Sequence, residues 1–157
     1  MTARIRPATP ADGAFILALA GRFSDFELPA WRRQDEIDRK NRDLLQEALD
    51  HPGADTGFFV AEAGGGAPAG FTHLHLETDF LTGDSNGYVA ELAVDPAFEG
   101  QGFARLLLEY AEAWARTRGC RLLTLYVYAG NRRARRVYEK FGFAPEVVRY
   151  VKVVQGP

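Results

Sequence analysis

The segment DPAFEGQGFARLLLEYAEAWA, residues 95–115, combines a turn, two closely spaced glycines and a long amphipathic pattern. Gly100 and Gly102 have no Cβ, so a ligand can come close to the backbone N–H groups of this loop. The helix that follows adds unpaired N–H groups and the positive end of its dipole. The loop is therefore expected to bind a phosphate or a pyrophosphate.

Two common nucleotide-binding motifs do not describe this loop. It lacks the Lys-Ser/Thr pair of a P-loop, which disfavours an NTPase, and its spacing differs from Gly-x-Gly-x-x-Gly, which disfavours a nicotinamide dinucleotide. A glycine-rich turn without a ligand is the alternative, because glycine is common in turns. Glu99 stands at the lip of the loop. Because its charge opposes a bound anion, we expect this side chain to point to solvent, where salt screens it.

The composition restricts the class of protein. The chain has 157 residues, 46% hydrophobic and 25% charged, as is typical of a water-soluble globular domain. A net charge of -2 argues against nucleic acid as the main partner. Cys120 is the single cysteine, so no internal disulfide can form and secretion gains no support. No apolar run approaches the roughly 18 residues of a membrane span, and a cytoplasmic protein is expected.

The elements around the loop are predicted from hydrophobic periodicity and from turn and cap residues. Helices are expected over Pro10–Phe23, Pro29–Asp50, Gly102–Gly119 and Asn131–Gly142. Strands are expected over Thr2–Arg6, Gly57–Ala63, Ala69–Phe80, Tyr88–Val94, Cys120–Tyr128 and Pro145–Val154. The order βααβββαβαβ predicts one α/β domain over residues 1–157, with a mixed central sheet.

Two stretches of the chain, residues 91–115 and 122–143, resemble the GNAT superfamily of N-acetyltransferases. The Arg/Gln-x-x-Gly-x-Gly/Ala signature of the family stands here as EGQGFA, residues 99–104. It departs from the family at Glu99, where arginine or glutamine is usual. The later family signature stands here as Asn131, Ala134, Tyr138, Gly142 and Phe143.

The resemblance implies that acetyl-coenzyme A binds between the fourth and fifth strands, which would be splayed apart. The backbone of three residues would pair with the pantetheine amides: Leu92, Ala93 and Val94. The N–H groups of the loop and the helix start would hold the pyrophosphate: Gln101, Gly102, Phe103 and Ala104. Asn131 would hydrogen-bond the pantetheine arm. An arginine of the helix after Asn131 could reach the 3′-phosphate, or the arginines there could form a solvated helix face.

Amine acetylation needs three things from a site. The amine must lose a proton, the thioester oxygen must be stabilised as it gains charge, and the leaving thiolate gains a proton. Backbone N–H groups near Leu92 and Ala93 are candidates for the second task. The resemblance places Tyr138 near the thioester sulfur, as a proton donor. The alternative is a core tyrosine, because Tyr138 lies on the apolar face of its helix.

Glu91 is the candidate base, acting directly or through water. It lies between YVA and LAV in an apolar strand, where a carboxylate is costly to bury without a partner or a purpose. The alternative is a structural carboxylate paired with an arginine.

Further residues are candidates for the acceptor side of the site. His73 and His75 share one face of a strand and could line the acceptor cleft, form a metal pair or lie on the surface. Phe26, Glu27 and Trp31 belong to a segment that would suit a cationic amine with an apolar part, as a lid over the acceptor. The alternative for that segment is an ordinary solvated pair of helices.

We therefore expect an N-acetyltransferase that moves an acetyl group from acetyl-coenzyme A to a primary amine, foremost of a small molecule, by direct attack. One alternative is acetylation of a protein N-terminus or lysine, and another is a module that binds acyl-coenzyme A without turnover. No metal, nucleic acid or membrane is expected as a partner. A homodimer through the last strand is compatible with the sequence, which does not show it.

Overall fold

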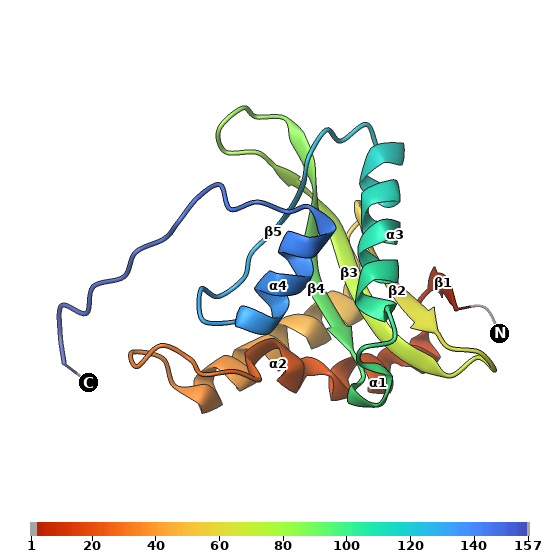
Figure 1. The fold of residues 1–157 in the computed structure, drawn as a ribbon, viewed down its shortest axis with the longest axis horizontal. Coiled ribbons are helices and arrows are strands. Elements are labelled where there is room, and N and C mark those ends of the chain that lie inside the picture. Colours follow the sequence, from red (N-terminus) through yellow and green to blue (C-terminus); the bar gives the residue numbers. More distant parts are fainter. Residues whose placement is uncertain (1–2, 157) are drawn as a thin grey trace.

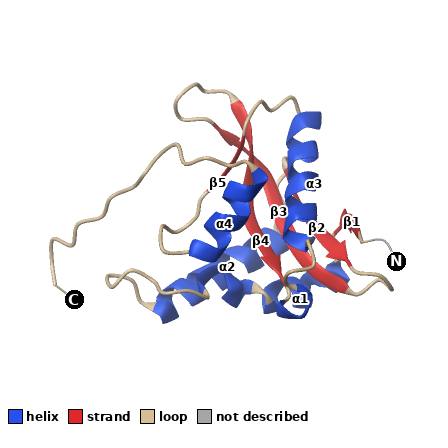
Figure 2. Ribbon diagram, viewed as in Figure 1, coloured by secondary structure: helices blue, strands red, loops and turns tan. Residues whose placement is uncertain are grey.

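A mixed β-sheet forms the centre of the fold, in a computed structural model that describes residues 3–156 (Figure 1). Thr2, at the start of the first expected strand, lies outside these residues. The strands are β1 (Arg4–Pro7), β2 (Thr56–Glu62), β3 (Pro68–Thr78), β4 (Ser85–Val94) and β5 (Leu123–Leu125). The helices are α1 (Gly13–Ala18), α2 (Gln34–Asp50), α3 (Phe103–Thr117) and α4 (Arg132–Phe141), with short 3-10 helices η1 (Pro10–Asp12), η2 (Ala20–Ser24) and η3 (Pro96–Phe98). Figure 2 colours the two kinds of element.

The strands follow one another in the sheet in the order of the chain, from β1 to β5. Neighbours are antiparallel up to β4, and β4 pairs with β5 in parallel. This last pairing joins residues 87–89 to residues 123–125 and extends no further. The backbone of residues 90–94 therefore has no partner on the side of β5. The predicted mixed sheet, splayed between its fourth and fifth strands, is confirmed.

The two faces of the sheet are covered by different helices. On one face, Val60 and Phe71 pack in a core with Ile16 of α1 and Leu45 of α2. On the other face, α3 packs its apolar side on the sheet, with Leu107 and Trp114 among the buried residues. The helical spacing of the apolar residues in α3 explains this packing, because every third or fourth residue faces the same way. Within residues 3–156, no helix is long and apolar enough to span a membrane.

Three expected elements are present in the structure with different bounds. The first helix is broken into η1, α1 and η2, and the second begins at Gln34, because Pro29–Arg33 form a turn instead of helix. The strand expected over Cys120–Tyr128 is regular only at β5. Glycines in the first helix account for its breaks, because glycine destabilises a helix. The divergence of β5 from its neighbour accounts for the short strand, because a strand needs a paired neighbour.

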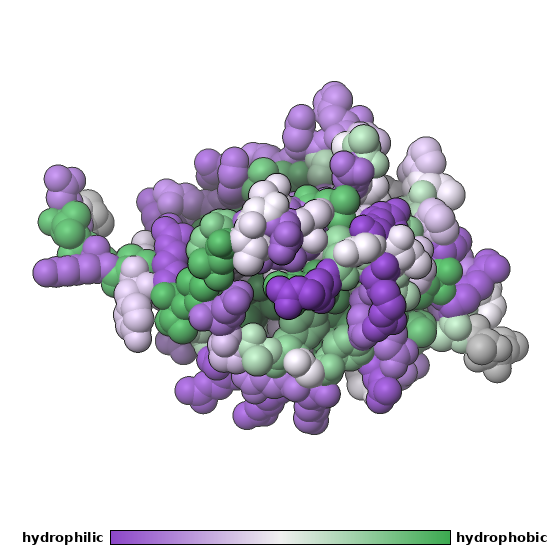
Figure 3. Space-filling view, turned by 90° about the horizontal axis from the view of Figure 1, so that it is seen from above, coloured by the Kyte–Doolittle hydropathy of each residue, from purple (hydrophilic) through white to green (hydrophobic). Residues whose placement is uncertain are grey.

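The prediction of a strand over Pro145–Val154 is wrong, because the described part of the chain after α4 pairs with no strand. It leaves the body as an extended segment, drawn as a loop in Figure 2. Figure 3 shows it as a projection that carries apolar and hydrophilic residues. A strand requires a neighbouring strand for its backbone hydrogen bonds, which β-forming side chains alone do not supply.

Candidate active site

A cleft of about 820 Å³ opens where β4 and β5 separate. Its walls come from β4, from the glycine loop with the start of α3, and from the chain between β5 and α4 with α4 itself. These include many of the expected cofactor-binding and catalytic residues, namely Glu91, Leu92, Ala93, Val94, Gly102, Phe103, Ala104, Asn131 and Tyr138. The structure thus brings these residues together from three separate segments of the chain.

The glycine loop owes its shape to two left-handed residues. Gly100 and Gly102 have φ values of 73° and 88°, which side-chain-bearing residues rarely adopt. The turn before them is fixed by Asp95, whose carboxylate accepts a hydrogen bond of 2.8 Å from the Ala97 N–H. Gly102 is the N-cap of α3, and the helix's first N–H groups have no acceptor within the helix. They open on the cleft, as an anion site requires.

Gln101, which was expected to share in this grip, is an exception among the loop residues. It is exposed, its amide donates to the Ala97 carbonyl at 3.2 Å, and it is not among the residues that line the cleft. The left-handed glycines on either side of it turn the chain there, so the residue lies on the outer side of the loop.

Glu99 does not point freely to solvent as expected. Its carboxylate forms an ion pair with Arg22 of η2, and Arg133 of α4 approaches it at 3.4 Å. Asp25 joins the same group, at 2.7 Å from Arg22. Burial, and then the nearby charge of Arg133, lowers the pKa of Arg22. Two arginines from distant segments therefore stand at the lip of the glycine loop, and both line the cleft.

Asn131 and Tyr138 face the cleft from the α4 side. The Asn131 side-chain oxygen accepts a hydrogen bond of 3.1 Å from the Ala134 N–H and so caps α4. Its amide N–H groups stay available to a ligand. Burial raises the pKa of Tyr138. Within residues 3–156, no hydrogen bond to the Tyr138 hydroxyl is found, so a neutral phenol with a free proton faces the cleft.

Glu91 is paired with a histidine rather than with an arginine. His73 Nδ1 lies 2.6 Å from Glu91 Oε2, and His73 Nε2 lies 2.7 Å from the Thr56 hydroxyl oxygen. His73 is 7% exposed, and its ring stacks on Phe58 at a centroid distance of 4.0 Å. With the proton on Nδ1, the imidazole donates to the carboxylate and accepts from the threonine hydroxyl. This line of polar groups crosses three neighbouring strands.

A β-bulge decides which side chains face one another in this part of the sheet. Glu91 is opposite His73, but Val89 is opposite the next residue along β3, so Ala90 is the extra residue on β4. Tyr88 and Glu91 are three positions apart and would lie on opposite faces of a regular strand. The bulge puts both on the side of the two histidines. Burial, and then the negative charges of Glu77 and Glu91, raises the pKa of Tyr88 to about 12.

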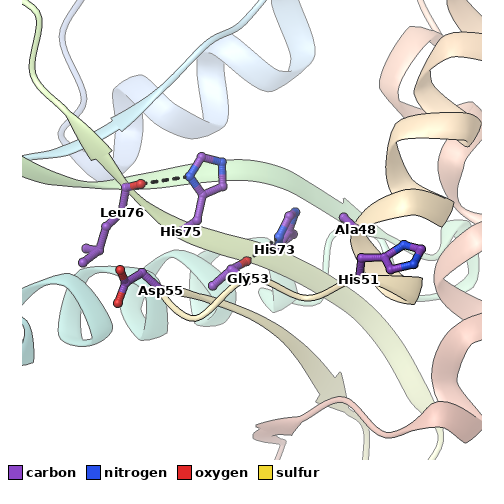
Figure 4. Close-up of a pocket in the computed structure, with 8 residues that line it drawn as sticks. Ala48, His51, Gly53, Asp55, His73, His75 and Leu76 are labelled. Carbon is purple, nitrogen blue, oxygen red and sulfur yellow. Dashed lines mark hydrogen bonds between the residues drawn. The ribbon is translucent and has the colours of Figure 1, made fainter.

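The two strand histidines lie outside the main cleft. They line a smaller hollow of about 310 Å³ with His51 and Asp55 (Figure 4). His75 Nδ1 is 3.2 Å from the Leu76 carbonyl, and its ring packs edge-on against Tyr88. In Figure 4 the labelled histidine rings do not converge on one point. Among residues 3–156, no group of three or more side chains that could hold a metal ion is found.

The expected lid lies beside the cleft without lining it. Phe26 packs against Tyr128 at a centroid distance of 5.3 Å, and the Glu27 carbonyl lies close to Gly130. Trp31 is 48% exposed. These contacts set the segment against the chain between β5 and α4. Arg22, Tyr88 and Tyr126 are among the cleft residues that sequence reasoning missed. The sequence offered a signal for the two tyrosines, since an aromatic residue stands in each of the two expected strands that separate at the cleft.

Comparisons with known proteins agree with this geometry. Residues 20–143 match the model of the acetyltransferase (GNAT) family. The type 1 aminoglycoside N(6′)-acetyltransferase of Stenotrophomonas maltophilia is 33% identical over 122 residues, which are 76% of this chain and 71% of that protein. The mycothiol acetyltransferase of Nocardiopsis dassonvillei is 37% identical over 105 residues, 65% of this chain, and the chain spans only 32% of its length.

The similarity of this chain to solved structures shows a shared fold and nothing more. The ribosomal-protein-alanine N-acetyltransferase of Brucella melitensis has a TM-score of 0.69 and 20% identity, with 97% of this chain and 99% of that chain covered. An α/β fold whose mixed sheet opens beside a glycine loop and a helix N-terminus has a shape and polarity that suit an elongated anionic ligand. The family match makes the assignment specific, and the chain belongs to the acetyltransferase (GNAT) family.

Proposed function

We propose that the chain transfers the acetyl group of acetyl-coenzyme A to the primary amine of a small molecule. The observation that carries the proposal is the cleft between β4 and β5, which is bordered by a helix N-terminus at one end and holds Glu91 and Tyr138. The names of the two relatives, an aminoglycoside and a mycothiol acetyltransferase, support a small acceptor.

The residues of the cleft suit coenzyme A. The unpaired N–H groups at the start of α3 and the two arginines at Glu99 match a pyrophosphate, because both kinds of group bind anions. The backbone of residues 92–94 has no strand partner on the side of β5, so it can hydrogen-bond the amides of a pantetheine arm there, as a neighbouring strand would. When bound, acetyl-coenzyme A supplies an activated acetyl thioester.

The reaction then requires two proton transfers by side chains of the cleft. The amine nitrogen forms a bond with the thioester carbon, the C–S bond breaks, and Glu91 accepts the proton that the amine loses. Tyr138 gives a proton to the departing sulfur, for which its raised pKa is suitable because the phenol remains protonated. N–H groups of β4 near Leu92 and Ala93 stabilise the negative oxygen. His73 is a positioning residue, which holds the Glu91 carboxylate through a partly buried hydrogen bond.

The alternative of a protein N-terminus as acceptor rests on the shared fold with the ribosomal-protein-alanine enzyme. The fold likeness does not choose between acceptors, because both acceptor classes occur on it among the matched proteins. Amine panels decide the question. Aminoglycosides, amino sugars, alkyl diamines and peptides with free N-termini or lysines are each offered with acetyl-coenzyme A, and release of free thiol is followed. Fastest turnover with a peptide would favour the protein acceptor.

Binding is tested separately from turnover. Acetyl-coenzyme A should raise the melting temperature, because a ligand that binds only the folded state stabilises that state. The absence of both a thermal shift and calorimetric binding at millimolar ligand would end the proposal. Binding without thiol release from any amine would leave a module that binds acyl-coenzyme A without turnover.

The role of Glu91 is tested by Glu91→Gln, which keeps the shape and removes the charge. As the base, Glu91 sets the acidic limb of the pH–rate profile, so that limb should move or vanish in the variant. Glu47→Gln is the matched control, since Glu47 also lies beside a histidine, at 3.3 Å from His51, but is 73% exposed and outside the cleft. An unaltered profile in Glu91→Gln would assign the proton transfer to another group.

A further inference from the structure

Aromatic side chains wall the cleft at the end away from the glycine loop, where β4 and β5 meet. Tyr88 of β4 and Tyr126, which follows β5, both line the cleft, and their rings pack edge-on at a centroid distance of 5.7 Å. The His75 ring also packs edge-on against Tyr88, at 4.7 Å. Tyrosine rings present an apolar surface that attracts a nearby positive charge. This end therefore suits the carbon chain of an amine.

Two carboxylates share the face of the sheet on which Tyr88 lies. The bulge in β4 brings Glu91 to this face. Glu77 lies on it as well, because it is two positions beyond His75 on β3, and it is opposite residue 86 of β4. Residues 86 and 91 come before and after Tyr88, so the two carboxylates approach its ring from opposite directions along the strand. Burial, and then the charges of Glu77 and Glu91, raises the pKa of Tyr88, as expected for this placement.

The separation of the two carboxylates is close to the length of an alkyl diamine. Glu91 is opposite His73, four residues before Glu77 on β3, so the two positions are about 13 Å apart along the strand. The Glu77 carboxylate leans back from its own position, since Oε2 lies 3.3 Å from the hydroxyl oxygen of Thr124, which is opposite Tyr88. At about 3.3 Å a residue, this leaves about 10 Å between the charges. A chain of about six to eight carbons between two amines spans about 9 to 11 Å, with bonds of about 1.5 Å.

Neither carboxylate has a basic side chain that neutralises it permanently. Within residues 3–156, neither forms an ion pair with an arginine or a lysine, and the polar partners are His73 for Glu91 and Thr124 for Glu77. A half-buried carboxylate without a counter-ion is costly, and a cation beside it relieves that cost. Glu99 also lines the cleft, but arginines hold it beside the glycine loop. The two carboxylates near the tyrosines are therefore open to a cationic ligand.

We propose that the acceptor is a linear diamine with about six to eight carbons between its amines. One ammonium pairs with Glu91 and is acetylated, the other pairs with Glu77 and keeps its charge, and the carbon chain lies over Tyr88 and Tyr126. Glu91 takes the first proton of the reacting ammonium. The second proton leaves the nitrogen after attack and balances the proton that the sulfur gains as the C–S bond breaks. The inference rests on the proposed acetyl transfer and adds the length and charge of the acceptor.

Steady-state acetylation of matched amines by the full chain tests the second charge and the length, with release of free thiol as the readout. The six-carbon diamine should have a kcat/KM about fivefold higher than the six-carbon amino alcohol, because only the diamine can form the second ion pair. The three-carbon diamine is too short to span both carboxylates and should be no better than the three-carbon amino alcohol. Equal values for the six-carbon pair, or an aminoglycoside as a better acceptor, would refute the diamine and leave the acetyl transfer standing. No thiol release from any amine would refute the transfer itself.

Glu77→Gln tests the carboxylate that does not react, and it keeps a partner for Thr124. It should raise KM for the six-carbon diamine about fivefold with kcat little changed, because the lost ion pair is the same in the ground and transition states. KM for the amino alcohol should stay the same. Asp55→Asn is the control, since Asp55 lies beside the smaller hollow, next to β2 (Figure 4). An equal rise in KM for the amino alcohol, or an equal effect of Asp55→Asn, would refute the pairing with Glu77.

The products give an independent test that needs no variant. A diamine that is already acetylated at one end has a neutral group to offer to Glu77, so it should be as poor an acceptor as the amino alcohol. Mass spectrometry during turnover should therefore find the monoacetylated diamine long before the diacetylated form. A second acetylation as fast as the first would show that the far charge is not recognised.

Discussion

Removal of the Glu99 charge should tighten binding of coenzyme A. Glu99 holds Arg22 in an ion pair and lies 3.4 Å from Arg133, and both arginines line the cleft beside the glycine loop. A pyrophosphate at the helix N-terminus would compete with the carboxylate for these guanidinium groups. Glu99→Gln keeps the length of the side chain and removes the competing charge. It also removes like-charge repulsion between residue 99 and the ligand.

The size of the effect follows from the exposure of the partners. The Glu99 side chain is 42% exposed and that of Arg133 is 54%, so solvent screens their interaction, while Arg22 is only 19% exposed. Ion pairs of this kind are worth about 0.2–1 kcal/mol each. We expect a net gain of about 1 kcal/mol, which is about a fivefold lower Kd. Without ligand, the free energy of unfolding of the variant should fall, by somewhat less than this gain in binding.

Isothermal titration of coenzyme A at low and high salt measures this effect. The gain should be present at about 0.05 M salt and be mostly lost at about 1 M, where the screening length falls to roughly 3 Å. Glu112→Gln is the control, because Glu112 pairs with Arg116 on the exposed side of α3 and lies outside the cleft. This substitution makes the same change of charge at a distance from the cleft. If Glu99→Gln binds no more tightly than Glu112→Gln, or binds more weakly than the parent, Glu99 serves to hold the arginines in place and the reasoning is refuted.

Three further changes test the site and the fold. Tyr138→Phe should lower turnover on the order of 10²-fold with little change in the Kd of coenzyme A, since only the donated proton is lost, and unchanged turnover with chemistry rate-limiting would make Tyr138 a packing residue. His73→Gln should move the acidic limb of the pH–rate profile without changing that Kd, because it frees Glu91 from its 2.6 Å partner; a lower melting temperature with an unmoved profile would restrict His73 to a structural role. Asp12→Asn should lower the free energy of unfolding by about 2 kcal/mol at pH 7, because Arg6 bonds to the buried Asp12 carboxylate and holds its pKa well below the ordinary value. That stabilisation is present above about pH 4 and is lost as the pH falls, so urea unfolding should show the difference shrinking toward pH 3, and a difference independent of pH would contradict the assignment.

The features that depend on near neighbours in the chain follow from the residue types and their spacing. The helical spacing of Phe103, Leu107 and Trp114 sets the face that α3 buries, and left-handed turns at Gly100 and Gly102 follow from the residue type. These local rules were sufficient to predict a glycine loop that opens a helix, and to place it beside a splayed sheet once the resemblance to the family was recognised.

Which distant groups come into contact depends on how the elements pack in three dimensions. Glu99 and Arg22 are 77 residues apart in the chain, and their pairing depends on how η2 packs against the loop. The bulge at Ala90 brings Tyr88 and Glu91 to one face, and the register of β3 puts His73 opposite Glu91; neither follows from a pattern within a single strand. The chain after α4 makes the same point, since residues 146–154 favour a strand but have no neighbouring strand to pair with in the part of the chain that the structure describes.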